Sequence, residues 1–198
     1  GVSGMSSTSL WLNTNKASIT GLKDFTSADK IAIPGIRTSL AAVVLEMMVA
    51  KEFGRENYGK LDPLTVGLAH PDGVAALIGG KTEITAHFTS APFMYQELED
   101  KRIHKVLDSY EVLGGPHTFN VVWATAKFHD ENPKVVQAFI AALDDAMKQI
   151  AKDPAEAAKV WVKNENSKIP VAEIERMIRL PENEWTMVPK RIMSYADF

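Results

Sequence analysis

The chain contains no cysteine among its 198 residues. This absence excludes disulfides, thiolate metal sites and a cysteine nucleophile, although it fits a reducing or an oxidising compartment equally well. The sequence also lacks an excess of positive charge, because 22 basic residues face 25 acidic ones and the formal net charge is −3. Nucleic-acid binding depends on clustered lysine and arginine, so a nucleic-acid partner is not expected.

Long apolar runs and familiar catalytic signatures are missing as well. The longest apolar stretch, residues 40–50, is interrupted by Glu46 and is far shorter than the roughly 20 apolar residues that cross a bilayer. Residues 1–9 lack the charge and the apolar run of a signal peptide, which predicts a mature product or a fragment. The five histidines show no His-x-x-x-His spacing, and neither a Gly-x-Ser-x-Gly elbow nor a Walker phosphate loop occurs. We therefore predict no metal, no cofactor and no hydrolase chemistry.

What is present is a recurring strand, loop and helix. Residues 30–33 predict a short buried strand, followed by a Pro-Gly turn and a helix that starts at Thr38 and Ser39. That helix carries one apolar stripe and should end at Gly54; the stripe is Leu40, Val43, Val44, Met47 and Met48. The pattern recurs as strand 64–69, turn 70–73 and helix 74–78, and again as strand 83–88, loop 89–92 and helix 93–99.

A fourth apolar strand is predicted at residues 103–110. Strands that alternate with helices indicate a mostly parallel sheet covered on both faces, so we expect a three-layer α/β domain over about residues 17–112. Such sheets bind ligands at the carboxyl ends of their strands. The loops after Ile33, Ala69 and Phe88 are therefore expected to share one rim.

The character of the sequence changes after Gly-Gly-Pro at residues 114–116. One more strand is predicted at 119–124, then helices at about 133–150, 154–162 and 170–178, and the start of another at 193–198. The first of these helices should bury a stripe made of Val136, Phe139, Ile140, Leu143, Met147 and Ile150. Two strands at 2–5 and 10–13 have no helix to pack against, so the missing sheet should come from sequence absent here or from a partner chain.

Several short motifs, each common in α/β proteins, occur in an informative order. They are Gly-Met-Ser-Ser at 4–7, Leu-Trp-Leu-Asn at 10–13, Leu-Lys-Asp-Phe at 22–25, Lys-Ile-Ala-Ile-Pro-Gly-Ile-Arg-Thr-Ser at 30–39, Ala-Leu-Ile-Gly-Gly at 76–80 and Asn-Pro-Lys-Val-Val-Gln-Ala-Phe at 132–139. In this order and spacing the chain resembles, over nearly its whole length, the solute-binding proteins of nitrate, sulfonate, taurine and thiamine-precursor ABC transporters. It departs from them at Glu83, where the family more often has Asp, and in lacking the first half of the N-terminal lobe.

The resemblance implies a periplasmic-binding-protein-like fold of type II, with two three-layer α/β/α lobes, the first incomplete here, joined by two crossing strands. Residues 1–16 would end the first lobe and form a crossing strand, 17–118 would form the second lobe, and 119–198 would return to the first. It further implies a non-enzymatic component of an ABC importer that captures a small anionic solute and delivers it to a membrane permease. Its place would be the periplasm or the cell exterior, with or without a lipid anchor.

Thr38 and Ser39 open a helix directly after a strand, where backbone amides and the helix dipole suit a sulfonate, nitrate or carboxylate group. Arg37 could add positive charge. The same residues would also serve as an ordinary helix cap beside a solvated arginine. Ser6 and Ser7 could reach the ligand from the opposite lobe, or lie on a solvated strand edge.

Two further pairs of polar residues are expected on the rim. His70 and Asp72 belong to the second loop, and Thr89 and Ser90 to the third, where they could orient a ligand. Turn chemistry alone also explains the Pro-Asp-Gly sequence that contains Asp72.

Two other functions share this architecture. A pyrimidine-precursor synthase of similar fold carries a cysteine-rich motif, which a chain without cysteine cannot supply. A ligand-sensing domain of a regulator would need a fused DNA-binding or signalling segment, and the sequence leaves that alternative open.

Overall fold

The computed structural model describes residues 1–190, and these residues form two compact units. Unit 1 consists of Gly1–Thr8 and the described residues from Pro116 onward, and unit 2 is Ser9–Gly115. The helix predicted at residues 193–198 lies outside the described residues. Within residues 1–190, no helix has both the length and the apolar character needed to cross a membrane.

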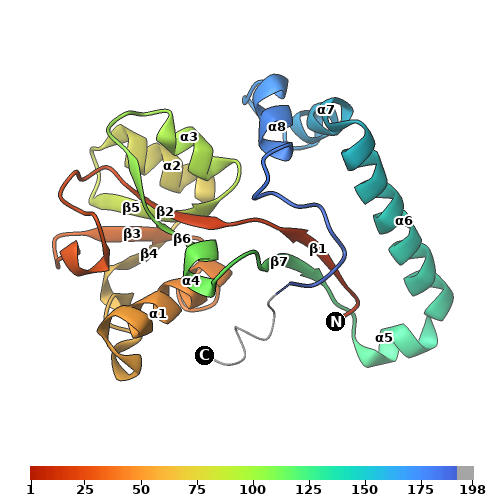
Figure 1. The fold of residues 1–198 in the computed structure, drawn as a ribbon, viewed down its shortest axis with the longest axis horizontal. Coiled ribbons are helices and arrows are strands. Elements are labelled where there is room, and N and C mark those ends of the chain that lie inside the picture. Colours follow the sequence, from red (N-terminus) through yellow and green to blue (C-terminus); the bar gives the residue numbers. More distant parts are fainter. Residues whose placement is uncertain (191–198) are drawn as a thin grey trace. The chain divides into compact units, whose positions relative to one another are not determined.

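Unit 2 is built on a five-stranded sheet in the order β4, β3, β5, β2, β6 (Figure 1). The strands are β2 (Leu10–Thr14), β3 (Lys30–Ile33), β4 (Thr65–Gly67), β5 (Ile84–Ser90) and β6 (His104–Asp108). β3 is parallel to β4 and β5, while β2 runs antiparallel to both β5 and β6. All strands except β2 therefore share one direction. Because β2 lies between β5 and β6, two of the four pairings are antiparallel, and the sheet is mixed where a mostly parallel one was predicted.

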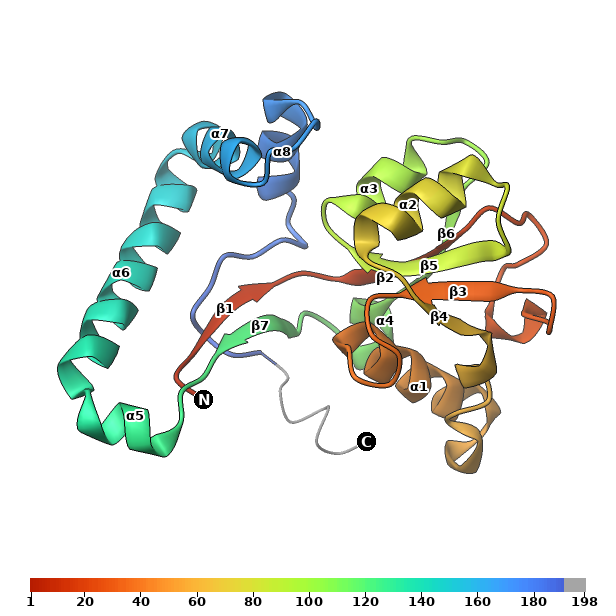
Figure 2. The same cartoon turned by 180° about the vertical axis from the view of Figure 1, so that it is seen from behind.

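Helices cover both faces of this sheet. On one face lie α1 (Leu40–Phe53) and α4 (Ser109–Leu113), and on the other α2 (His70–Gly79) and α3 (Phe93–Leu98) (Figure 1, Figure 2). Three short 3₁₀ turns complete the unit: Leu22–Asp24, Arg55–Asn57 and Asp62–Leu64. The predicted three-layer α/β arrangement is confirmed, and α4 was missed because its residues were assigned to the end of the preceding strand and to the loop after it.

The central strands supply most of the core. Leu12, Ile31, Ile33 and Phe88 have no exposed side-chain surface, and each such burial contributes roughly 1.5–3 kcal/mol to folding. Helices cover both faces of these strands, so β3 is apolar at three consecutive residues. β2 and β5 bury polar residues as well, among them Asn13 and His87.

The predicted apolar stripe of α1 is only partly correct. Val44 and Met48 are buried, but Leu40, Val43 and Met47 are half-buried. The rest of the buried face consists of Ala41, Ala42, Leu45 and Val49. Because this helix is apolar on nearly every side, periodicity alone does not select the face that packs on the sheet.

The predicted ends of the helices are largely confirmed. Ser39 is the N-cap of α1, where its hydroxyl accepts a hydrogen bond from the amide of Ala42 at 3.2 Å. Gly54 and Gly80 follow α1 and α2 with φ of 96° and 60°, values that favour glycine.

Two predicted loops are wrong. Residues 70–73 form the first turn of α2, since Pro71 fits a first helical turn, and Asp72 is exposed and does not cap the helix. Thr89 and Ser90 continue β5 as buried residues because they pair with Trp11 and Leu10 of β2.

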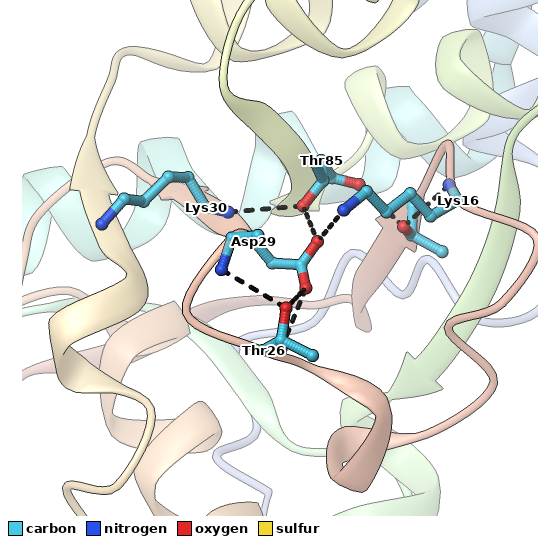
Figure 3. Close-up of polar contacts among 7 residues, drawn as sticks. Lys16, Thr26, Asp29, Lys30 and Thr85 are labelled. Atoms are coloured by element: carbon cyan, nitrogen blue, oxygen red, sulfur yellow. Dashed lines mark hydrogen bonds and ion pairs between the residues drawn. The ribbon is translucent and has the colours of Figure 1, made fainter.

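A buried carboxylate ties the starts of β3 and β5 together. Asp29 accepts hydrogen bonds from Lys16 at 2.5 Å, from the amide and hydroxyl of Thr26 at 2.9 Å, and from the Thr85 hydroxyl at 3.1 Å (Figure 3). Burial alone raises the pKa of Asp29, but the hydrogen bonds from Lys16, Thr26 and Thr85 outweigh it and lower that pKa to about 2.

Unit 1 has an antiparallel pair of strands, β1 (Ser3–Ser7) and β7 (Thr118–Val122). Its helices are α5 (Ala126–Glu131), α6 (Pro133–Lys152), α7 (Pro154–Asn164) and α8 (Val171–Ile178). Helices were predicted at the positions of α6, α7 and α8, and these are confirmed; α5 was not predicted.

The predicted burial of the α6 stripe is wrong for the described residues. No side chain of α6 is buried, and Phe139 is 50% exposed. The sequence period places the apolar residues correctly on one face, but no other part of residues 1–190 buries that face.

Candidate functional site

The carboxyl ends of β3, β4 and β5 lie at the same edge of the unit 2 sheet because the three strands are parallel. This edge is followed by the first turns of α1, α2 and α3. The predicted common rim is therefore confirmed, and the polar groups along it define the candidate site.

The first rim segment is largely occupied by its own hydrogen bonds. The amides of both Thr38 and Ser39 donate to the Gly35 carbonyl, at 3.4 and 3.2 Å, and the Ser39 hydroxyl donates to the same oxygen at 2.8 Å. The sequence suggested that these two amides could bind an anion, but both are already occupied by the Gly35 carbonyl. Thr38 is exposed, and within residues 1–190 its hydroxyl has no hydrogen-bond partner.

Arg37 is held beside this segment by an acidic neighbour. Its Nε lies 3.1 Å from Asp62 Oδ2, and its side chain is 71% exposed. Its φ of 61° places it in the left-handed region, which fits a tight turn between β3 and α1. A solvated pair of this kind adds little to stability but leaves the guanidinium at the rim.

Polar side chains under α2 and α3 form a continuous hydrogen-bonded chain, which we call the His70 network: Thr89, His70, His87, Glu97 and Asn13. His70 Nδ1 lies 3.0 Å from Thr89 Oγ1 and 3.1 Å from His87 Nε2. His87 Nδ1 lies 2.5 Å from Glu97 Oε1, and Asn13 Nδ2 donates to Glu97 Oε2 at 2.9 Å.

The inner part of the His70 network is fully enclosed. The side chains of His87 and Glu97 have no exposed surface, and Asn13 is also completely buried. A buried carboxylate is tolerated only when hydrogen bonds or charges compensate for lost water, and here both of its oxygens are engaged.

Gly73 allows α2 to approach this network closely. A Cβ at this position would lie 2.7 Å from both Cε1 and Nε2 of His87. The first turn of α2 therefore rests directly on the His87 ring, which brings His70 within hydrogen-bonding reach of it.

His70 forms the outer end of the network. Its ring is half-buried and stacks on Phe93 with a centroid separation of 5.4 Å. Burial, and to a smaller extent the neighbouring His87, lowers the pKa of His70 to about 4. His70 is therefore neutral at pH 7.

Three buried polar atoms in β2 and the residue before it have no hydrogen-bond partner among the described residues: Ser9 Oγ, Trp11 Nε1 and Asn13 Oδ1. Trp11 and Asn13 pair with Thr89 and His87 across the β2–β5 ladder, so these side chains share one face of the sheet. This face thus carries unused hydrogen-bonding capacity, which is uncommon in a folded core.

The structure groups some predicted site residues and leaves others apart. His70 and Thr89 are in contact, whereas Asp72 on the same turn as His70 is exposed. Ser90 is buried at the end of β5.

The predicted serines belong to β1 of unit 1. Ser6 and Ser7 are buried there, and the Ser7 hydroxyl donates to the His117 carbonyl at 2.7 Å. They do not lie on a solvated strand edge, and their participation with the unit 2 rim stays a prediction.

Sequence reasoning missed His87, Glu97 and Gly73. A histidine in a strand expected to be covered on both faces was a usable signal, because such a side chain must find a polar partner. Nothing in the periodicity identifies Glu97 as that partner. Within residues 1–190, no cluster of His, Asp or Glu side chains could hold a metal ion.

No protein-family model matches the sequence, and no curated protein matches it significantly. Solved structures do match. The alkanesulfonate-binding protein SsuA from Xanthomonas axonopodis pv. citri, bound to MOPS, has a TM-score of 0.68 and 18% identity, covering 99% of this chain and 65% of that protein. The periplasmic aliphatic sulphonate-binding protein SsuA from Escherichia coli has a TM-score of 0.65 and 15% identity, covering 99% and 62%.

A putative sulfonate ABC transporter's periplasmic sulfonate-binding protein, SsuA from Methylobacillus flagellatus KT, gives a TM-score of 0.63 at 18% identity, covering 99% of this chain and 58% of that protein. The chain thus spans less than two thirds of the length of each of these proteins. The fold of this chain is therefore that of the periplasmic solute-binding proteins.

Proposed function

We propose that this chain is part of the solute-binding component of an ABC importer and that it captures a small anion, such as a sulfonate, taurine-like molecule or nitrate, for a membrane permease. The observation that carries the proposal is the match of the fold, over 99% of the chain, to sulfonate-binding proteins. The protein works in the periplasm or outside the cell and performs no catalysis.

The unit 2 rim provides groups suited to such a solute. Thr38 contributes an exposed hydroxyl at the start of α1, where the amides of Thr38 and Ser39 donate to Gly35 and that of Ala42 donates to Ser39. Arg37 adds positive charge, while His70 and Thr89 offer polar atoms at the ends of β4 and β5. Ser39, Asp72 and Ser90 complete the proposed set of ligand-binding residues of unit 2.

The lobes expected from the sequence, residues 17–118 and residues 1–16 with 119–198, stay a proposal. The compact units divide instead near residues 8 and 115, because β2 pairs with β5 and β6 in the unit 2 sheet. The ligand-sensing domain of a regulator uses the same capture chemistry and is the alternative. A transport component with bound solute would contact a membrane permease, whereas a sensing domain with bound solute would contact a signalling segment.

Removing the Thr38 hydroxyl tests the anion site. We expect Thr38→Ala to weaken binding of ethanesulfonate by about 5- to 10-fold, roughly 1–1.5 kcal/mol, because one hydrogen bond to a charged oxygen is lost. Isothermal titration calorimetry on the protein at its natural length gives the dissociation constant. Thr82→Ala is the control, since Thr82 is exposed at the opposite edge of the sheet, before β5.

Ser39→Ala separates stability from binding at the same helix start. Its hydroxyl is engaged by Gly35 and Ala42, so its loss should cost about 1 kcal/mol of folding stability through the cap.

An unchanged affinity in Thr38→Ala would remove Thr38 from the site. If no sulfonate, taurine, nitrate or carboxylate raises the melting temperature or gives heat on titration, the proposed function is wrong.

A further inference from the structure

The amino end of β2 lies at the same edge of the sheet as the carboxyl ends of the parallel strands. Because β2 runs antiparallel to its neighbours, Trp11 pairs with Thr89 near the end of β5 and with Asp108 at the end of β6. Ser9 directly precedes β2, and the backbone amide that follows it donates to the Ser109 hydroxyl, at 2.8 Å, where α4 begins. Ser9 and Trp11 therefore belong to the rim on which the candidate site is built.

Two hydrogen-bond donors at this end of β2 are buried and unused. The indole N–H of Trp11 can only donate, and the Ser9 hydroxyl can donate or accept. Both groups are enclosed, yet neither has a hydrogen-bond partner within residues 1–190. Burying a polar group without a partner costs free energy, so such groups are uncommon in a folded protein unless something else binds them.

The donors at the other end of β2 are all engaged. The Thr14 hydroxyl donates to a backbone carbonyl at 2.7 Å, and Asn15 Nδ2 donates to another at 2.9 Å. In the middle of the strand, Asn13 Nδ2 donates to a backbone carbonyl at 3.1 Å, so the unpaired atom of Asn13 is the acceptor Oδ1. Among the described side chains of residues 9–15, the unpaired donors thus lie only at the rim.

The indole ring of Trp11 is held in place from two sides. Tyr95 of α3 meets it edge-on, with centroids 5.1 Å apart and an angle of 83° between the ring planes. Lys105 of β6 lies over the ring, 4.7 Å from its centroid, and pairs with Asp108 at 3.1 Å. A donor on a ring that is already fixed loses little conformational entropy when a ligand binds to it.

The two donors are too far from Thr38 to bind the same head group of a solute. Thr38 follows β3, and β5 separates β3 from β2, so these two strands are about 9–10 Å apart. Thr38 leads into α1 on one face of the sheet, whereas Trp11 contacts α3 on the other (Figure 1, Figure 2). A single sulfonate or nitrate group is much smaller than this separation.

We propose that Ser9 and Trp11 form a second polar subsite, which binds an oxygen-bearing acceptor group at the far end of the solute. The inference rests on the proposed function and narrows its substrate class. The solute has an anionic head group for the start of α1 and, several bonds away, a carboxylate, carbonyl or sulfonyl oxygen for the two donors at β2. A simple alkanesulfonate, with one polar end, uses only half of this site.

A matched pair of ligands separates the two ends of the site. Sulfobutyrate and butanesulfonate share the sulfonate group and the chain length, but only sulfobutyrate ends in a carboxylate. Isothermal titration calorimetry on the protein at its natural length should show sulfobutyrate binding about tenfold more tightly, because its carboxylate accepts from the buried donors. Equal affinities, or tighter binding of butanesulfonate, would overturn the inference.

Two variants remove the donors one at a time. Trp11→Phe deletes the indole N–H and keeps an aromatic ring beside Tyr95 and Lys105, and Ser9→Ala deletes the hydroxyl. Each should weaken sulfobutyrate binding by about 5- to 10-fold and leave butanesulfonate binding unchanged. Because each variant is measured with both ligands, general damage to the fold, which weakens both, is distinguished from loss of the subsite. Sulfobutyrate binding at the wild-type affinity in both variants contradicts the assignment.

Ser109→Ala is the matched control for Ser9→Ala. Both serines are fully buried, but the Ser109 hydroxyl accepts from the Leu10 amide, whereas the Ser9 hydroxyl is unpaired. Ser109→Ala should lower the melting temperature of the ligand-free protein by about 2–4 °C and leave the ratio of the two affinities unchanged. Ser9→Ala should lower that ratio without lowering the melting temperature.

NMR of the indole N–H groups observes Trp11 directly in the wild-type protein. Its Nε1–H resonance, assigned by its absence in Trp11→Phe, should move downfield on saturation with sulfobutyrate and stay in place with butanesulfonate. A resonance that stays in place with both ligands would mean that a buried water, or nothing, meets the donor, and the second subsite would be refuted while the proposed function stands. If the wild type binds no sulfonate, taurine, nitrate or carboxylate at all, the proposed function fails and this inference fails with it.

Discussion

At the scale of single residues, Asp29 is the clearest case of a polar side chain that stabilises unit 2. Asp29→Asn should lower the free energy of unfolding by about 2–3 kcal/mol, because Lys16 loses its ion pair and a buried amide replaces a full set of acceptors. Urea denaturation at pH 7 measures this. Asp24→Asn is the control: Asp24 also accepts from Thr20 and Gly21 but is exposed, so its loss should have a smaller effect.

The same carboxylate predicts a pH dependence. Asp29 has a pKa of about 2 when folded and an ordinary value of 3.8 when unfolded. Between these values the unfolded chain binds more protons, so the contribution of Asp29 is complete above about pH 4 and is lost as the pH falls toward 2. Asp29→Asn should flatten the stability profile in that window. A variant with the wild-type slope would show that Asp29 is not responsible.

Gly73 makes a second prediction at this scale. Alanine usually favours a helix over glycine by about 1 kcal/mol, yet Gly73→Ala should destabilise by about 1–3 kcal/mol because its Cβ would overlap the immobile His87 ring. Gly79→Ala in the same helix is the control, since nothing lies within 4 Å of the added Cβ. A Gly73→Ala protein as stable as wild type would mean that α2 does not rest on His87.

At the scale of elements, α6 stands out because its apolar face lacks cover. Val136, Ile140, Leu143 and Met147 are half-buried and Phe139 is 50% exposed. An apolar face of this kind usually marks a contact surface. We expect the 198-residue chain to associate in a concentration-dependent way, and Phe139→Glu to weaken that association several-fold in analytical ultracentrifugation.

Val160→Glu on α7 serves as the control for this experiment, because Val160 is similarly exposed, at 49%, but belongs to another helix. Association that persists unchanged in Phe139→Glu would assign it to another surface. A compact monomer at all concentrations would contradict the expectation that α6 needs cover.

At the scale of the whole molecule, the hydrophobic core is unevenly shared. Unit 2 holds nearly all the fully buried apolar side chains, while unit 1 contributes Ala158, Ile174 and Met177 among the described residues. The sulfonate-binding proteins with this fold are about 1.5 to 1.7 times as long as this chain, since it covers 58–65% of them. In the proposed function, unit 2 contributes one edge of polar groups to solute binding.

The sequence by itself determined the alternation of strands and helices, the caps at Ser39, Gly54 and Gly80, and the class of fold. These features depend on residues close together in the chain: side-chain periodicity, a hydroxyl before a helix, a glycine after it. Local patterns gave the wrong structure where one sequence fits two conformations. Residues 70–73 have the composition of a loop turn, but they also fit the start of an α-helix.

Only the tertiary structure decided which polar groups meet. Asn13, His87 and Glu97 come from two strands and a helix, and their contact depends on the β2–β5 register and on the close approach that Gly73 permits. It also decided that the Thr38 and Ser39 amides are already bound to Gly35 and that the α6 stripe is left uncovered. Such outcomes rest on distances between residues far apart in sequence, which no local pattern encodes.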